Sequence, residues 1–163
     1  MVKRSRYVVT ALVVILLIAT ALHKRLLDGL DGEFLARTLG DTTKYADKYT
    51  DHGFRQVHVG MSDAEVRQLV GEPLSESWVY RPEPCDVVFF RNGVVSPFIA
   101  KACAEKGITR GLAPPEVIRV LGSTPTKIVW LYSESTSDSH YRERVVELDQ
   151  NRVSRVIAEF YID

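Results

Sequence analysis

The sequence predicts an α+β fold, in which two tandem helix-plus-antiparallel-sheet repeats follow an N-terminal transmembrane or signal helix. A helix motif at Gly60–Pro73 returns in looser form at Gly111–Pro125. Each copy precedes an aromatic strand, Trp78–Tyr80 in the first and Trp130–Tyr132 in the second. Because a helix followed by a strand meander occurs twice, we expect helices packed on an antiparallel sheet. The expected boundaries are 1–27 for the N-terminal helix, 28–53 for a helical linker, 54–106 for the first repeat and 107–163 for the second.

The N-terminus is typical of an export segment. Residues 7–22 are an apolar run flanked by basic residues. The run is shorter than the ~20 residues that a spanning helix prefers, and Ala19-Thr20-Ala21 has the small-x-small form of a cleavage site. Lys24 and Arg25 argue against cleavage, because they would be the third and fourth residues of the mature chain. Leu26 and Leu27 could lengthen an uncleaved span through tilt and snorkelling of those two basic side chains. We expect an inner-membrane anchor with the C-terminal domain in the periplasm, or else release into the periplasm after cleavage near Ala21.

The charge of the body argues against a nucleic-acid partner. The whole chain has 21 basic and 21 acidic residues, but residues 1–25 hold five of the basic residues and no acidic one. The remaining 16 basic and 21 acidic residues give the body a net charge of −5. Binding to a phosphate backbone depends on clustered Lys and Arg, so we exclude nucleic acid.

Residues 28–53 are expected to form two short helices. The first covers residues 33–39 and ends at Gly40, and Asp41 caps the second. The second would carry Tyr45 and Tyr49 on one face, four residues apart. These tyrosines either dock a partner or pack the linker onto the body.

The repeated helices have clear boundaries. Ser62 and Glu65 form a capping box, and Gly71 with Pro73 ends the first helix. In the second copy, Pro114 is a good first-turn residue after Ala113. The positions expected to define this scaffold are Gly60, Ser62, Glu65, Gly71, Pro73, Gly111, Glu116 and Gly122.

Strands are expected after each helix, at residues 77–80, 86–91, 127–132, 141–148 and 153–162. Asn92-Gly93 is a strong hairpin turn signal, and Pro97 weakens the strand that returns from it. The polar segment 133–140 is expected to be a solvated loop. His58 alternates with Val57 and Val59, which predicts a position on the wet face of a strand.

A set of these residues resembles a known family signature: Val57, Val59, Gly60, Met61, Ser62, Val66, Leu69, Gly71, Pro73, Trp78 and Tyr80. It resembles the SmpA/OmlA family, small outer-membrane lipoproteins tied to β-barrel assembly, and more broadly modules of the β-lactamase-inhibitor-protein fold. The resemblance implies a binding module, not an enzyme, with small helices on one face of a sheet. The chain departs from the family in lacking the lipoprotein Cys, in its Phe90–Gly93 hairpin and in carrying two copies.

The aromatic strands allow two interpretations. Trp78 and Tyr80 share one strand face, as do Trp130 and Tyr132, while aliphatic residues take the other face. If the helices cover the aliphatic face, the four aromatics line an open face suited to protein binding. If the helices cover the aromatic face, the four aromatics form the core.

Cys85 and Cys103 are the two cysteines and would lie outside the cytoplasm, where pairing is expected. A regular hairpin through Asn92-Gly93 places Cys85 opposite Ala100, about 10 Å short of Cys103 by strand rise. A disulfide therefore requires the irregularity at Pro97 to bring the two residues together. The alternative is two small buried residues.

Nothing in the sequence indicates an enzyme, a cofactor or a metal site. The four histidines are scattered, and the metalloprotease and hydrolase motifs are absent. Cys85 with His58 or His140 is the one dyad that can be constructed, which leaves a thiol enzyme as a remote alternative.

The expected function is therefore a membrane-anchored extracytoplasmic protein-binding module of the bacterial cell envelope. Its partner is an envelope protein of unknown identity, it contacts the membrane through residues 7–22, and no small-molecule substrate is evident. The alternative is a structural component that supports outer-membrane protein assembly, with contacts through the segment 26–53.

Overall fold

The computed structural model describes residues 2–81, 85–137 and 139–162, with side chains from residue 11 onward apart from 24 and 25. Its helices are α1 (Val2–Arg25), α2 (Gly29–Leu39), α3 (Asp51–Phe54), α4 (Asp63–Val70), α5 (Lys101–Glu105) and α6 (Pro114–Leu121). Its strands are β1 (Thr43–Tyr45), β2 (Ser75–Val79), β3 (Val87–Arg91), β4 (Val94–Val95), β5 (Lys127–Leu131), β6 (Ser133–Ser135), β7 (Tyr141–Asp149) and β8 (Arg152–Tyr161). The predicted α+β class with antiparallel sheet is confirmed.

One continuous sheet joins the two halves of the body. Its strand order is β4-β3-β2-β5-β7-β8, and all neighbours are antiparallel. The central pair is β2 with β5, in which Trp78 lies opposite Ile128 and Glu76 lies opposite Trp130. Pairing is therefore symmetrical about Ser77 and Val129, and the halves are related by an approximate two-fold axis through the middle of the sheet.

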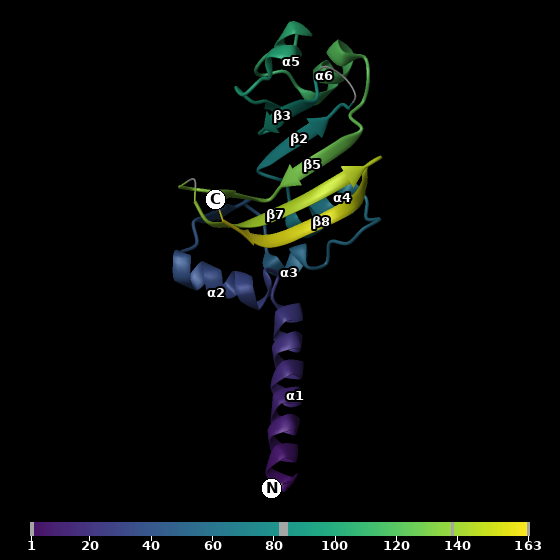
Figure 1. The fold of residues 1–163 in the computed structure, drawn as a ribbon. Coiled ribbons are helices and arrows are strands. Elements are labelled where there is room, and N and C mark those ends of the chain that lie inside the picture. The colour runs from purple at the N-terminus through teal and green to yellow at the C-terminus, as the bar shows by residue number, and fades with distance from the viewer. Residues whose placement is uncertain (1, 82–84, 138, 163) are drawn as a thin grey trace.

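The two repeated helices are exchanged between the halves. Val66 and Val70 of α4 belong to a core that contains Trp130 and Tyr132 of the second half. Val117 of α6 belongs to a core built on β2 and β3 of the first half. We call these the proximal core (Ala46, Phe54, Val57, Val66, Val70, Trp130, Tyr132, Val146, Leu148, Val153) and the distal core (Trp78, Tyr80, Cys85, Val88, Phe90, Val95, Cys103, Ile108, Val117), by their distance from α1 in Figure 1.

Backbone pairing explains the exchange. The Val153 amide donates to the Met61 carbonyl at 2.8 Å, so the segment before α4 is tied to β8. The Val95 amide donates to the Leu112 carbonyl at 2.9 Å, so the segment before α6 is tied to β4. Each helix therefore packs over the strands of the other half, and neither half has a complete core of its own.

The predicted boundaries of the two repeated helices are confirmed, whereas the helix expected over residues 33–39 begins earlier, at Gly29. The Ser62 amide donates to Glu65 Oε2 at 2.8 Å and the Ser62 hydroxyl accepts from the Glu65 amide, which together make the capping box. In α6 the Ala113 amide donates to Glu116 Oε2 at 2.8 Å, while the alanine offers no side-chain acceptor. Gly122 ends α6 in the left-handed region, with φ of 72°.

The expected hairpin at Asn92-Gly93 is also confirmed. Both residues have positive φ, 53° and 74°, as a two-residue turn requires. The returning strand β4 has two residues and ends before Pro97, as the proline predicts.

Residues 41–49 differ from the expected helix. The Asp41 carboxylate accepts from the Thr43 amide at 3.0 Å, which turns the chain into strand β1 instead of capping a helix. β1 pairs with β6, so residues 133–135 of the expected loop are strand, and Ser133 is buried. Tyr45 and Tyr49 still meet, with rings stacked at 4.5 Å. Tyr49 packs against the proximal core, which supports the packing interpretation of this pair.

His58 also lies outside any strand, because the pairing with β8 starts after it, at Gly60 and Met61. The ring is exposed and its Nδ1 lies 3.2 Å from the Val59 carbonyl.

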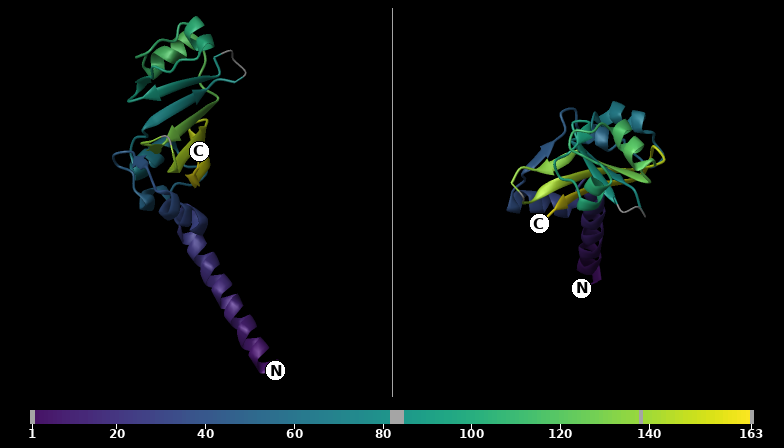
Figure 2. Two further views of the ribbon diagram at one scale, coloured as in Figure 1. Left: turned by 60° about the vertical axis from the view of Figure 1, so that its left-hand side comes forward. Right: turned by 90° about the horizontal axis from the view of Figure 1, so that it is seen from above.

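The helix α1 projects away from the body, as both views show (Figures 1 and 2). Eight consecutive residues, 11–18, are exposed, so its apolar side chains are uncovered on every side. Over the part of the chain that is described, no helix has the length and apolarity needed to cross a bilayer.

Candidate functional site

The helices cover the aromatic face of the sheet. Trp78, Tyr80, Trp130 and Tyr132 are 8%, 2%, 2% and 0% exposed. The arrangement in which these four aromatics line an open surface is therefore wrong for this structure, and the alternative, a core role, holds. The small valines of α4 and α6 offer little area of their own, so the large rings on the sheet supply most of each core's volume.

The two Trp residues lie close to the approximate two-fold axis, and the two Tyr residues lie farther from it along their strands. Trp78 and Trp130 both line a groove of about 690 Å³ together with Arg67 and Glu76. The Arg67 guanidinium lies 4.3 Å from the centre of the Trp130 ring, a cation–π contact, and Trp78 Nε1 donates to Glu76 at 3.2 Å. Arg67 and Glu76 at the sides of this groove are thus already in contact with the two tryptophans.

Each tyrosine is buried in one core, Tyr132 in the proximal core and Tyr80 in the distal core. The Tyr132 hydroxyl donates to the Gly71 carbonyl at 3.1 Å, which ties the end of α4 to β5. The Tyr80 hydroxyl has no hydrogen-bond partner among the described residues, and burial raises its pKa to about 12. Trp78, Tyr80, Trp130 and Tyr132 are therefore packing residues, and the candidate surface lies on the opposite face of the sheet.

The face of the sheet opposite the helices has an aliphatic centre. Residues alternate along each strand, so the neighbours of the buried aromatics point away from the helices. Phe89 of β3 is 45% exposed, and Phe98, which follows the hairpin of β3 and β4, is 80% exposed. We define the open face by Val79, Val87, Phe89, Val94, Val129, Leu131, Val145 and Ile157, of which Val145 is buried and the others are half-buried or exposed.

Charged residues at the rim of the open face are paired with one another. Lys127 Nζ lies 2.8 Å from Glu147 on the neighbouring strand. Glu134 lies between Lys44, at 3.0 Å, and Arg91. The face therefore combines an apolar centre with ion pairs at Lys127, Glu147 and Glu134. Glu143 and Glu159 lie opposite each other on β7 and β8 as a like-charged pair, and burial together with Glu159 raises the pKa of Glu143. A complementary surface would have to be apolar at its centre.

Comparison with protein families, characterised proteins and solved structures finds no match for this chain.

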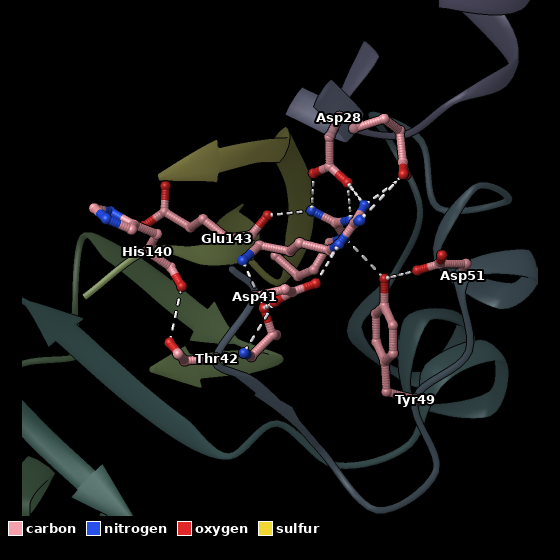
Figure 3. Close-up of polar contacts among 11 residues, drawn as sticks. Asp28, Asp41, Thr42, Tyr49, Asp51, His140 and Glu143 are labelled. Carbon is pink, nitrogen blue, oxygen red and sulfur yellow. Dashed lines mark hydrogen bonds and ion pairs between the residues drawn. The ribbon is translucent and has the colours of Figure 1, made fainter. Parts of the chain in front are cut away.

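A buried ionic cluster joins the N-terminal segment to the sheet (Figure 3). Arg144 of β7 is fully buried and binds Asp28 through two hydrogen bonds of 2.6 and 2.9 Å. Its Nε donates to the Tyr49 hydroxyl at 2.9 Å, and that hydroxyl donates to Asp51 at 2.7 Å. Arg142, two residues before Arg144 on the same face of β7, also binds Asp28.

Arg142 extends the cluster to the linker. It lies 2.7 Å from both Glu33 of α2 and Asp41 of the following turn. The hydrogen bond from Arg142 lowers the pKa of Glu33, and hydrogen bonds from Thr43 and Arg142 outweigh burial to lower that of Asp41. Burial alone would lower the pKa of Arg144, but Asp28 raises it, so the guanidinium stays charged. We call Asp28, Glu33, Asp41, Tyr49, Arg142 and Arg144 the ionic mount.

The expected disulfide between Cys85 and Cys103 is present, with a Cα–Cα distance of 4.5 Å. A regular hairpin would leave the two residues too far apart. The strand β4 stops after two residues and the chain then folds into α5, which was not predicted and which carries Cys103 back toward Cys85. Both cysteines are buried in the distal core.

The structure brings together no catalytic set from the sequence candidates. Cys85 is bonded to Cys103 and has no thiol to ionise, so the dyads with His58 or His140 do not form. Among the described residues no three His, Cys, Asp or Glu side chains are grouped as metal ligands would be.

The ionic mount is the main feature that sequence reasoning missed. Its one local signal is the run Tyr141-Arg-Glu-Arg144, in which two arginines alternate onto the covered face of a strand. A buried Arg indicates a carboxylate partner, but the partner Asp28 lies 116 residues away in the chain.

Proposed function

We propose that this protein is a membrane-anchored extracytoplasmic protein-binding module of the bacterial cell envelope, and that it binds its partner protein through the open face. The observation that carries the proposal is the combination of exposed Phe89 with an uncovered aliphatic sheet centre. The module acts by binding and not by catalysis.

The chemistry of the open face favours a protein partner. The cores of protein interfaces are depleted in charge and enriched in aromatic residues. Contiguous apolar patches on a soluble surface commonly mark such interfaces. The rim charges of Lys127 and Glu134 are compensated within the chain, so the partner is expected to present an apolar patch at its centre.

The N-terminal segment supplies the attachment in this proposal. The apolar run at residues 7–22 enters the inner membrane, and the body lies in the periplasm. The alternative remains release into the periplasm after cleavage near Ala21. The disulfide between Cys85 and Cys103 is in keeping with an oxidising compartment.

Site-specific photocrosslinking in native membranes tests the proposal. A photoreactive residue at position 94 lies on the open face beside Phe89, and one at the exposed position 68 of α4 lies on the helix side and serves as the control. We expect a discrete protein adduct from position 94 and none from position 68. The added variant Phe89→Asp should abolish the adduct and leave the melting temperature unchanged, because Phe89 is outside both cores.

Two outcomes would refute the open face as the binding site. One is an adduct at position 94 that persists in the folded Phe89→Asp variant. The other is a set of adducts that form from position 68 alone.

A further inference from the structure

We propose that the outward face of α2 lies in the membrane surface, with Leu30 and Phe34 immersed at the boundary between headgroups and acyl chains. The inference rests on the membrane attachment of residues 7–22 proposed above and goes further by assigning a lipid-contacting role to a second helix. It commits to one occupant for this helix face, which is lipid.

The two faces of α2 are distinct. Gly32 and Ala36, four residues apart, are buried against the body. A Cβ added at Gly32 would lie 3.3 Å from that of Phe160, so this side of α2 is in close contact with β8. Leu30 and Phe34 are also four residues apart but are offset by two positions, about 200° around the helix. They are 38% and 67% exposed and therefore point away from the body.

The placement of α2 suits a membrane surface. Figure 1 shows α2 lying beneath the sheet and across the direction of α1, at the level where α1 reaches the body. The outward face of α2 is thus on the side toward which α1 extends. A bilayer that surrounds α1 would reach α2 along its length, as expected of an interfacial helix.

The ionic mount holds α2 in this orientation. Asp28 precedes the first residue of α2 and is bound by Arg142 and Arg144. Glu33, on the next turn, is bound by Arg142 at 2.7 Å. Because these contacts fix α2 to β7, Leu30 and Phe34 cannot turn inward to become covered by the body.

Lipid is a better occupant than a protein for this face. Leu30 and Phe34 lie on the next helix after α1, whose side chains at residues 11–18 are uncovered. One medium therefore covers both, and no separate partner is needed. The outward face has one acidic and one basic neighbour, Asp31 and Arg37, so insertion depends on apolar burial and not on anionic lipids.

Quenching by brominated lipids tests this placement on the full chain. The chain is reconstituted in phosphatidylcholine vesicles with and without acyl-chain-brominated phosphatidylcholine. The variant Phe34→Trp reports on α2, and Phe98→Trp is the matched control, since Phe98 is 80% exposed at the far end of the molecule. Trp78 and Trp130 are buried and give both variants the same background.

We expect brominated lipid to reduce the emission of the introduced tryptophan in Phe34→Trp and to leave that of Phe98→Trp unchanged. The loss should persist when phosphatidylglycerol replaces part of the phosphatidylcholine. Flotation of the same samples separates the two proposals. A chain that floats but shows no added quenching overturns the inference about α2 alone, and a blue-shifted emission without quenching would then identify a second copy of this chain as the occupant. A chain that does not float overturns the membrane attachment and this inference with it.

Discussion

The two ends of the sheet are held by different chemistry. At the proximal end a buried ion cluster joins residues far apart in the chain, such as Asp28 and Arg144. At the distal end a disulfide joins Cys85 to Cys103 of α5, 18 residues apart, in the core that also holds Val117 of α6. The approximate two-fold symmetry of the strands therefore does not extend to what stabilises them.

The difference follows from what each end must order. The proximal end has to fix the long N-terminal segment in one orientation, and directional ion pairs with several acceptors do this. The distal end has to close a short irregular loop around a small core, where a covalent link is effective because it restricts the unfolded chain. We infer that the ion pairs at the proximal end fix the orientation of the N-terminal segment, and that the disulfide at the distal end closes the loop.

Among the substitutions that test this difference, Arg144→Met is expected to lower the free energy of unfolding most. It leaves the carboxylate of Asp28 buried with half of its partners, and breaking a buried ion pair in this way costs about 3 to 5 kcal/mol. Urea unfolding should show this loss, and hydrogen exchange should increase in α2 and β7 while β2 and β3 keep their protection.

The double variant Arg144→Met with Asp28→Leu is the control, because it removes both buried charges. It should recover a large part of the lost stability. If the single variant is as stable as the native chain, the ionic mount is not what holds the proximal end.

Cys85→Ala with Cys103→Ala should have the next largest effect. For a loop of this length, loss of the link costs about 3 kcal/mol through the entropy of the unfolded chain. Exchange should increase first in α5 and around Val95, at the opposite end from the Arg144 variant. Equal exposure of both ends would show instead that the sheet opens as one unit.

Substitutions at the N-caps of α4 and α6 should have the smallest effect on stability. They test whether each helix packs on the opposite half of the sheet. Ser62→Ala removes the hydroxyl that accepts from the Glu65 amide, at a cost of about 1 kcal/mol. Ala113→Ser adds the missing hydroxyl to α6 and should stabilise the chain by a fraction of that amount. Because α4 covers β5 and β7, Ser62→Ala should raise exchange at Trp130 and Val146, in the second half of the sequence. Faster hydrogen exchange confined to β2 and β3 would contradict the packing of α4 over the second half.

Local chemistry within the sequence determined the α+β class, the boundaries of the two repeated helices and the hairpin turn. Ser62 and Glu65 are three residues apart and specify a helix start whatever packs on it. Asn92-Gly93 likewise specifies its turn through backbone conformation alone. The pairing of Cys85 with Cys103 was one of two open alternatives, because it depends on α5, which lacks a capping side chain.

Tertiary structure alone decided which face of the sheet is open, which half each helix covers and which acids meet Arg142 and Arg144. Alternation along β2 and β5 separates aromatic from aliphatic faces but does not say which one the helices occupy. That choice follows from the pairing of residues 60–61 with β8 and of residues 111–112 with β4, contacts between segments distant in sequence. The surfaces proposed for protein and lipid, on the open face and on α2, exist only once those long-range contacts have formed.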